Sequence, residues 1–293
     1  MSHSPQQGVL FIGLGVMGYH MAGHISQNFN TFVYNRTETK AEQWSSEFKG
    51  NICPDLHALP DQLNYVLTCI GNDTDLKEVY LSGHGLIQQA KPGTILIDHT
   101  TASADVAREI AIAANTNGLH FIDAPVSGGE QGAINGQLTV MCGGSQTVFE
   151  QAKPVMDCYA KAVTLLGSNG AGQLTKMCNQ IAIAGLVQGL SESIHFAKQA
   201  GLDAQQVIDV ISKGAAQSWQ MDNRHKTMIA GEYEHGFAVD WMRKDLGICL
   251  DEGRRNAAKL PVTALVDQFY ADVQAMGGQR WDTSSLLERL SKK

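Results

Sequence analysis

A single lysine stands in a long uncharged stretch near the middle of the chain. Between Lys161 and Glu192, Lys176 is the only charged residue. Burying an unpaired ammonium group is costly, so such a lysine usually has a polar partner, a solvated cleft or a lowered pKa. A lysine of lowered pKa could pass a proton to a carbonyl oxygen during its reduction, and Asn179 and Gln180 follow on the same helical face. From composition alone, a lysine that extends to solvent is the simpler interpretation.

A glycine-rich turn near the N-terminus predicts a phosphate site. Gly13-Leu14-Gly15-Val16-Met17-Gly18 follows an apolar strand-like run and opens a helix-like one. The first glycine permits a tight turn, the second lets the backbone approach a pyrophosphate, and the third allows close helix–strand packing. The N–H groups at the helix start then face the phosphates. In this context the motif predicts dinucleotide binding.

The residues after the second predicted strand indicate which dinucleotide is bound. Asn35, Arg36 and Thr37 stand where an acidic residue would bind the ribose 2′-hydroxyl of NAD. Without that carboxylate, a guanidinium and a hydroxyl can bind a 2′-phosphate instead. The segment favours NADP(H). The alternative, NAD(H), stays open because Arg36 and Thr37 would also suit an ordinary helix start.

A second glycine-rich segment, Asp123 to Gly129, follows another predicted strand. Ligands of open α/β sheets bind beyond the carboxyl ends of the strands. The Ser127 hydroxyl and the backbone N–H groups of Gly128 and Gly129 could therefore hold a carboxylate. An ordinary structural loop accounts for the same residues equally well.

Short apolar runs alternate with amphipathic segments through the first half, as in a parallel, doubly wound Rossmann-type sheet. After Gly167 only helices are predicted, beginning with a long one over 173–200, so we expect a dinucleotide-binding domain over 1–167 and an all-α domain over 168–293. The predicted strands are 8–13, 30–34, 65–70, 94–98, 120–123, 138–142 and 162–166. The other predicted helices are 16–27, 37–48, 103–117, 145–158, 203–212, 218–230, 239–256, 262–276 and 283–290.

Composition excludes several classes of protein. A formal net charge of -7 argues against a nucleic-acid partner. No apolar run is long enough for a membrane span, the polar start of the chain shows no secretory signal, and His20 and His24 lack the glutamate of a zinc-binding HExxH motif. Six scattered cysteines without a CxxC pair are typical of a reducing compartment. We therefore expect a cytoplasmic protein with no metal, and a homodimer or homotetramer because the long helix is so apolar.

These motifs together resemble the β-hydroxyacid dehydrogenase family, which includes 3-hydroxyisobutyrate dehydrogenase, tartronate semialdehyde reductase and glyoxylate/succinic semialdehyde reductases. The resemblance covers Gly8 to about Leu290. Besides the two glycine-rich segments, it rests on the motif Gly170 to Lys176 with Asn179, and on Phe237 followed by Lys244-Asp245. It implies an oxidoreductase that transfers hydride between NADP(H) and a small hydroxy or semialdehyde acid, with Lys176 as acid/base. It implies substrate contacts from Ser127, Gly128, Gly129, Asn179, Phe237 and Asp245, and cofactor contacts from Gly13 to Gly18, Asn35, Arg36, Thr37, Ile70, Gly71, Thr101 and Lys244.

Two departures from the family pattern leave questions open. Cys69-Ile70-Gly71-Asn72-Asp73 stands where many members have a Met-Leu-Pro stretch, and its backbone can still line the cofactor cleft. Asn179 precedes Gln180, whereas several relatives carry Asn at the second of these positions. We favour Asn179 as the substrate contact. An imine reductase and a non-catalytic dinucleotide-binding module are the alternatives, and the presence of Lys176 disfavours both.

Overall fold

The computed structural model describes residues 7–291. The polar residues 1–6, in which no secretory signal was recognised, lie outside the described part. Tertiary contacts divide the chain into two units, Met1–Lys176 and Met177–Lys293. The division falls inside one long helix, whose first residues pack with the first unit. The predicted domain boundary after Gly167 stays a prediction.

The first unit is built on a six-stranded parallel sheet of order β3-β2-β1-β4-β5-β6, which is the Rossmann order. The register places Asp98 opposite Asp123 at the carboxyl ends of two adjacent strands. The strands are β1 (Gly8–Ile12), β2 (Asn30–Tyr34), β3 (Asn51–Ile52), β4 (Leu63–Thr68), β5 (Ile95–Asp98) and β6 (His120–Asp123).

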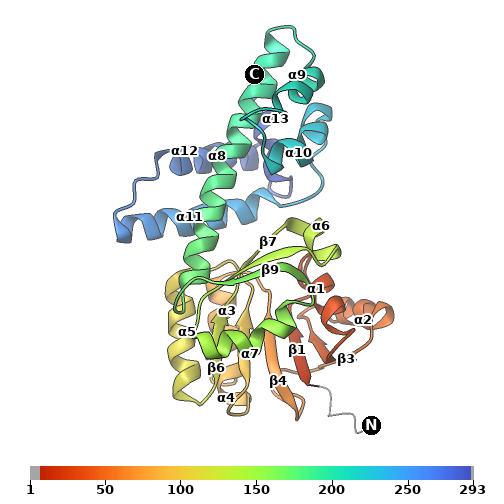
Figure 1. The fold of residues 1–293 in the computed structure, drawn as a ribbon, viewed down its shortest axis with the longest axis vertical. Coiled ribbons are helices and arrows are strands. Elements are labelled where there is room, and N and C mark those ends of the chain that lie inside the picture. The colour runs from red at the N-terminus through yellow and green to blue at the C-terminus, as the bar shows by residue number, and fades with distance from the viewer. Residues whose placement is uncertain (1–6, 292–293) are drawn as a thin grey trace. The chain divides into compact units, whose positions relative to one another are not determined.

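Helices cover both faces of this sheet, because every central strand is apolar on both sides. Val9 and Phe11 join a core with α1, α2 and α7, whereas Leu10 and Ile12 join a second core with α3, α4 and α5. Figure 1 shows α1 and α2 on one side of β1 and β4, and α3, α4 and α5 on the other. The helices are α1 (Gly18–Ile25), α2 (Glu38–Glu47), α3 (Asp73–Leu81), α4 (Leu86–Gln89), α5 (Ala104–Thr116) and α7 (Gln146–Met156).

A small second sheet completes the first unit. The predicted strands near 140 and 163 do not extend the main sheet; they pair with each other, and the first of them also pairs with a two-residue strand that was not predicted. β7 runs antiparallel to β8, and β8 runs parallel to β9. The elements are β7 (Val126–Ser127), β8 (Leu138–Cys142), β9 (Ala160–Leu165) and a short helix, α6 (Gly129–Ile134).

Two helix starts in the first unit differ from expectation. α1 begins at Gly18 rather than Val16, because the residues before it still belong to the glycine turn. Helix α3 was not predicted, although the side chain of Asn72 caps it by accepting hydrogen bonds from the N–H groups of Thr74 and Asp75. The Asn-Asp pair that opens this helix is a recognisable start signal.

The second unit is helical, as predicted. The side chains of Asp203 and Ser218 cap α9 and α10, and Pro261 opens α12. Two apolar cores hold its helices together. The elements are α8 (Ala171–Gln199, which begins in the first unit), α9 (Ala204–Ile211), α10 (Trp219–Ala230), α11 (Val239–Asn256), α12 (Pro261–Ala275), a 3-10 turn (Thr283–Ser285) and α13 (Leu286–Ser291).

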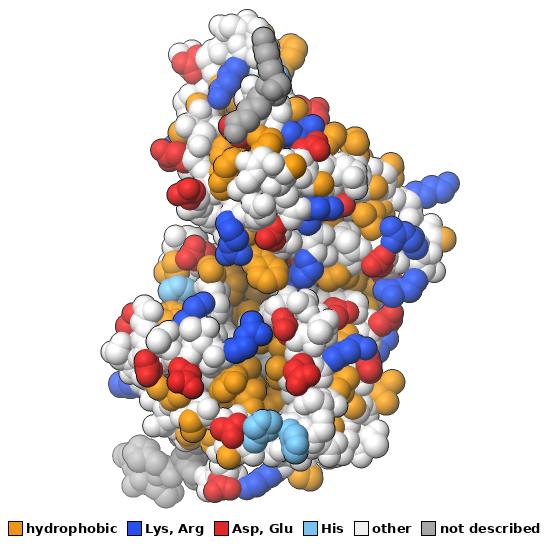
Figure 2. Space-filling model, turned by 180° about the vertical axis from the view of Figure 1, so that it is seen from behind, with side chains coloured by type: hydrophobic (Ala, Val, Ile, Leu, Met, Phe, Trp, Pro, Cys, Tyr) orange, Lys and Arg blue, Asp and Glu red, His pale blue; other side chains and the backbone are white. Residues whose placement is uncertain are grey.

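Charge is spread over the surface. On the face seen in Figure 2, Lys and Arg side chains are interspersed with Asp and Glu instead of forming a basic stripe. Within residues 7–291, no helix has the combined length and apolar character that crossing a membrane requires.

Candidate active site

The three glycines of the first turn meet different surroundings. A side chain at Gly13, whose φ is +100°, would clash with the carbonyl of Cys69, and one at Gly18 would clash with the carbonyl of Gly13. The fold itself therefore requires these two glycines. A Cβ at Gly15 would meet no atom within 4 Å. The open backbone at Gly15 fits a dinucleotide phosphate, which needs that close approach.

Asn35 joins this turn to the segment after β2. Its Oδ1 accepts a hydrogen bond from the N–H of Leu14 at 2.9 Å, and its Nδ2 donates to the carbonyl of Thr37 at 3.0 Å. Arg36 and Thr37 are exposed, and among the described residues none binds the Arg36 side chain. Asn35 thus positions the turn, while Arg36 is left to face a ligand. Val16 and Met17 complete the turn, with Val16 half exposed.

The loop after β5 is held to the loop after β4. The Oγ1 of Thr100 accepts from the N–H of Ile70 at 3.0 Å, and the N–H of Thr100 donates to Oδ1 of Asp98 at 3.1 Å. Gly71 follows Ile70, and a Cβ there would clash with the carboxylate of Asp75. Ile70, Gly71 and Thr101 therefore lie at the same carboxyl edge of the sheet as the glycine turn.

Beneath this edge lies a buried polar network. The carboxylate of Asp98 accepts from the Thr68 hydroxyl at 2.6 Å, while its Oδ2 is buried without a hydrogen-bond partner among the described residues. Burial raises the pKa of Asp98 to about 7. His99 contacts the carbonyl of Ala124 through Nδ1 at 2.6 Å and the hydroxyl of Tyr159 through Nε2 at 2.8 Å, and burial lowers its pKa to about 4. His99 is therefore neutral, with Nδ1 the donor.

Asp123 anchors the start of α8. Its two carboxylate oxygens accept from the N–H groups of Gly170 at 2.8 Å and Gln173 at 3.1 Å. A carboxylate at a helix N-terminus is favoured because it satisfies free N–H groups and complements the helix dipole. Burial nevertheless raises the pKa of Asp123. Lys176, which is 8% exposed, follows one turn after Gln173 on this anchored helix.

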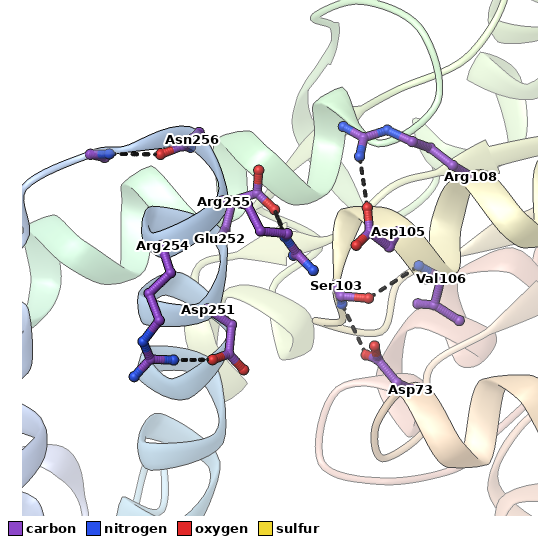
Figure 3. Close-up of polar contacts among 11 residues, drawn as sticks. Asp73, Ser103, Asp105, Val106, Arg108, Asp251, Glu252, Arg254, Arg255 and Asn256 are labelled. Atoms are coloured by element: carbon purple, nitrogen blue, oxygen red, sulfur yellow. Dashed lines mark hydrogen bonds and ion pairs between the residues drawn. The ribbon is translucent and has the colours of Figure 1, made fainter.

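The start of α5 is fixed in a similar way. The N–H of Ser103 donates to Oδ1 of Asp73 at 2.9 Å, and the Ser103 hydroxyl caps the helix by accepting from the N–H of Val106 at 3.1 Å. Figure 3 shows both bonds, together with the ion pair between Asp105 and Arg108 on the same helix. The loop that carries Thr101 is thus held at both ends.

The predicted carboxylate-binding residues, Ser127, Gly128 and Gly129, lie at the edge of the small sheet. Ser127 ends β7, and Gly128 and Gly129 have φ values of +135° and +63°. A Cβ at Gly129 would meet no atom within 4 Å, so the backbone there is open to a ligand. The left-handed conformation explains why two glycines follow the serine.

The second unit gathers its own set of candidate residues. The Nε2 of Gln180 donates to Oδ2 of Asp245 at 2.7 Å, and its Oε1 accepts from the Asn179 side chain at 2.8 Å. The ammonium of Lys244 lies 3.3 Å from Asp245 and 5.7 Å from the Trp241 ring centre. Gln180 is buried and occupied in this network, whereas Asn179 is partly exposed.

Phe237 is held by a residue that sequence analysis did not single out. Its N–H donates to the buried carboxylate of Asp282 at 2.9 Å, and its carbonyl accepts from the N–H of Thr283. Asp282 also pairs with Arg224 at 3.3 Å, and the Arg224 guanidinium lies over the Trp219 ring at 5.2 Å. Phe237, a predicted substrate contact, is therefore linked to Trp219 through Asp282 and Arg224.

Within residues 7–291, no group of three or more His, Cys, Asp or Glu side chains is arranged to hold a metal ion. Sequence analysis also missed Gln173 and Asp98. Asp98 ends a predicted strand next to a pair of threonines, a position that could have marked it. Gln173 gave no such signal, because its partners lie about seventy residues away in the sequence.

Comparison with known proteins agrees with this arrangement. Residues 8–167 match the NAD binding domain of 6-phosphogluconate dehydrogenase, and residues 170–290 match the NAD-binding domain of NADP-dependent 3-hydroxyisobutyrate dehydrogenase. An oxidoreductase of Shewanella frigidimarina is 60% identical over 97% of this chain and 98% of its own length. The 2-hydroxy-3-oxopropionate reductase of Escherichia coli is 31% identical over 96% of each chain.

A solved structure gives the same result. The 3-hydroxyisobutyrate dehydrogenase of Mycobacterium tuberculosis, determined with L-serine, superposes with a TM-score of 0.88 and is 26% identical, covering 98% of this chain and all of its own. The matched ranges span both halves of the chain, including the segments of the glycine turn and of the helix that carries Lys176. The chain belongs to the 3-hydroxyisobutyrate dehydrogenase-like β-hydroxyacid dehydrogenases, a family of NAD(P)-binding oxidoreductases.

Proposed function

We propose that this protein catalyses reversible hydride transfer between NADP(H) and a small hydroxy or semialdehyde acid, with Lys176 as the general acid/base. The observation that carries the proposal is the placement of Lys176. It is buried, and it lies one turn into a helix that Asp123 anchors at the carboxyl edge of the sheet. Ligands of such sheets bind at this edge.

All but one of the proposed cofactor contacts belong to the first unit, and Lys244 comes from α11 of the second. Open space at Gly15 suits a pyrophosphate, and the exposed, unpartnered Arg36 suits a 2′-phosphate, which is why we favour NADP(H) over NAD(H). The nicotinamide supplies or accepts the hydride when it is bound. The proposed cofactor contacts are Gly13, Leu14, Gly15, Val16, Met17, Gly18, Asn35, Arg36, Thr37, Ile70, Gly71, Thr101 and Lys244, with Asn35 acting through its hold on the turn.

The substrate carboxylate binds the Ser127 hydroxyl and the backbone N–H groups of Gly128 and Gly129. In the direction of reduction, the Lys176 ammonium donates a proton to the oxygen on which negative charge develops. In the direction of oxidation, the neutral amine takes that proton from the substrate hydroxyl. Asn179 and Phe237 contribute substrate contacts, and Asp245 holds the polar network beside Asn179.

We also propose that the protein works as a homodimer or homotetramer. Leu186 and Phe196 on α8 are 46% and 71% exposed, and Val262 and Leu265 on α12 are more than half exposed. Large apolar side chains gathered on the helices of one unit are typical of a surface that another subunit covers.

The test is steady-state kinetics with NADPH and NADH across glyoxylate, succinic semialdehyde and tartronate semialdehyde, and with 3-hydroxyisobutyrate in the oxidative direction. We expect turnover with at least one acid, and Lys176→Ala should lower kcat by a factor of about 100 or more. The matched control is Lys198→Ala, which removes an exposed lysine near the end of the same helix and should leave kcat unchanged.

Each part of the proposal can fail separately. A Lys176→Ala enzyme that kept more than about a tenth of wild-type turnover would exclude the acid/base role. A roughly thousandfold preference for NADH would overturn the assignment of Arg36, since it corresponds to about 4 kcal/mol against the 2′-phosphate. No turnover across the whole panel would favour a non-catalytic dinucleotide-binding module.

A further inference from the structure

We propose that Gln173 is a positioning residue that fixes the loop of residues 100–102 to the first turn of α8, so that Thr101 and Lys176 keep a constant separation. This inference rests on the proposed function, because it assigns Gln173 no chemistry of its own. All the residues that carry it belong to the first unit.

The Gln173 side chain is fully buried and uses both ends of its amide. Its Oε1 accepts a hydrogen bond from the N–H of Ala102 at 3.0 Å, and its Nε2 donates to the carbonyl of Thr100 at 2.7 Å. These two backbone groups flank Thr101 on either side. A single rigid amide therefore clamps the loop at two points, which fixes its direction as well as its distance from the helix.

The backbone of Gln173 is held as firmly as its side chain. Its N–H donates to Oδ2 of Asp123 at 3.1 Å, so the backbone of the residue is bonded to the end of β6 while its side chain is bonded to the loop after β5. Lys176 follows three residues later, about one helical turn further on. Gln173 is thus the junction of two strand ends and the helix that presents the lysine.

The remaining anchors of the loop do not duplicate this function. Thr100 is tied to Ile70 and Asp98, and Ser103 is tied to Asp73. These bonds hold the loop to β4, β5 and α3, whereas the hydrogen bonds that tie Thr100 and Ala102 to Gln173 reach α8. Without them, the loop and the lysine would be positioned independently. Misplacement of catalytic groups by about 1 Å can lower a rate by about a hundredfold.

The experiment compares Gln173→Met with Gln188→Met. The first replacement keeps the volume of the side chain and removes both loop bonds. The second makes the same change at a buried glutamine further along α8, whose Nε2 donates to Glu192 and to no loop. We expect Gln173→Met to lower kcat by roughly tenfold to a hundredfold, with the NADPH dissociation constant changed less than about threefold. Gln188→Met should leave both unchanged.

Hydrogen exchange tests the two loop hydrogen bonds without measuring turnover. Backbone hydrogen exchange, measured by mass spectrometry, should become faster in the segment 99–106 of Gln173→Met, because the Ala102 N–H has lost its acceptor. Gln188→Met should exchange in this segment as the wild type does. Unchanged exchange, or a kcat within about twofold of wild type, would overturn the proposal.

Gln173→Glu tests the same clamp if the methionine variant does not fold. When protonated, the introduced carboxyl can donate to the Thr100 carbonyl and accept from the Ala102 N–H; when ionised, it repels that carbonyl. We expect kcat relative to wild type at the same pH to be highest at low pH and to fall as the pH rises. A flat ratio would contradict the proposal.

The two proposals fail in distinguishable ways. If Lys176→Ala retains activity, the acid/base role is wrong whatever Gln173 does. If Lys176→Ala is inactive while Gln173→Met turns over like wild type, the acid/base role stands and the positioning role is wrong.

Discussion

The two units bury carboxylates by different means. In the first unit, Asp98 and Asp123 accept hydrogen bonds from hydroxyl and backbone N–H groups, and among the described residues neither has a cation within ion-pair distance. In the second unit, Asp282, Asp245 and Asp267 each lie beside an arginine or lysine. The first arrangement makes stability depend on protonation, whereas the second makes it depend on the presence of the partner charge.

The difference follows from what each carboxylate holds. Asp123 binds the N-terminus of a helix, where N–H groups and the helix dipole already favour negative charge. Asp282 holds a loop in which Gly236 and Phe237 come close to its oxygens, and the only helix it caps is the three-residue 3-10 turn Thr283–Ser285, which has a much smaller dipole than α8. A cation from α10, Arg224, takes that role instead.

The largest expected effect is at Asp282. Asp282→Ala should lower the free energy of unfolding by about 3–5 kcal/mol, because it leaves Arg224 and the N–H groups of Phe237 and Ser284 without their acceptor. Urea unfolding followed by tryptophan fluorescence measures the loss. Asp272→Ala, which removes an exposed partner of Arg289, is the control and should cost less than about 1 kcal/mol. Equal losses in the two variants would remove the contrast between the units.

The next effect is a pH dependence that belongs to the first unit. The pKa of Asp98 is raised from 3.8 to about 7, so the folded protein binds a proton that the unfolded chain has released between these values. Wild-type stability contributed by Asp98 is therefore present below pH 3.8 and is lost as the pH rises through about 7. Asp98→Asn cannot ionise, and its stability relative to wild type should rise by about 1.4 kcal/mol per pH unit in this window.

Thermal unfolding of wild type and Asp98→Asn at a series of pH values measures this difference. Asp61→Asn is the control, because it makes the same replacement at a side chain that is 96% exposed and pairs with an exposed lysine, Lys91. The Asp61→Asn difference should stay flat. A flat line for Asp98→Asn as well would show that burial does not raise the pKa of the wild-type Asp98 carboxyl above its value in the unfolded chain.

The smallest expected effect concerns neutral bonds, for which the units should not differ. Tyr159→Phe removes the donor to His99 in the first unit, and Tyr270→Phe removes the donor to the Thr283 carbonyl in the second. Both tyrosines are fully buried. Each change should cost about 1 kcal/mol in urea unfolding, with little dependence on salt. A difference of more than about 2 kcal/mol between them would mean that the units differ in more than their charges.

Much of the architecture could be predicted from local patterns. Helix α11 has the predicted bounds, and Asp203 and Ser218 cap their helices as predicted, because periodicity and capping act over a few residues. Helix α3 and strand β7 were missed. The helix was missed because its cap residue, Asn72, was considered only as a departure from the family pattern and not as a helix start. The strand was missed because two residues are too few to show alternation.

The same distinction between local and long-range signals applies to the residues of the candidate site. The glycine turn could be recognised because its residues are consecutive and their spacing carries the geometry. The roles of Gln173 and Asp282 could not, because each acts on backbone groups distant in sequence that only the tertiary structure brings within reach. Asn35 stays a predicted cofactor contact, and the structure adds that its amide is engaged with the backbone of Leu14 and Thr37, which no local pattern indicated.

Gly15 has a consequence for how natural variants of this protein are interpreted. Its neighbours Gly13 and Gly18 are constrained by the chain, so a substitution at either is removed by any selection for folding. Gly15 has free space around its missing side chain, so alanine there leaves the folded chain undisturbed. Screens that score abundance or heat resistance would classify such an allele as benign, and only growth that depends on the bound dinucleotide would reveal it as a loss of function.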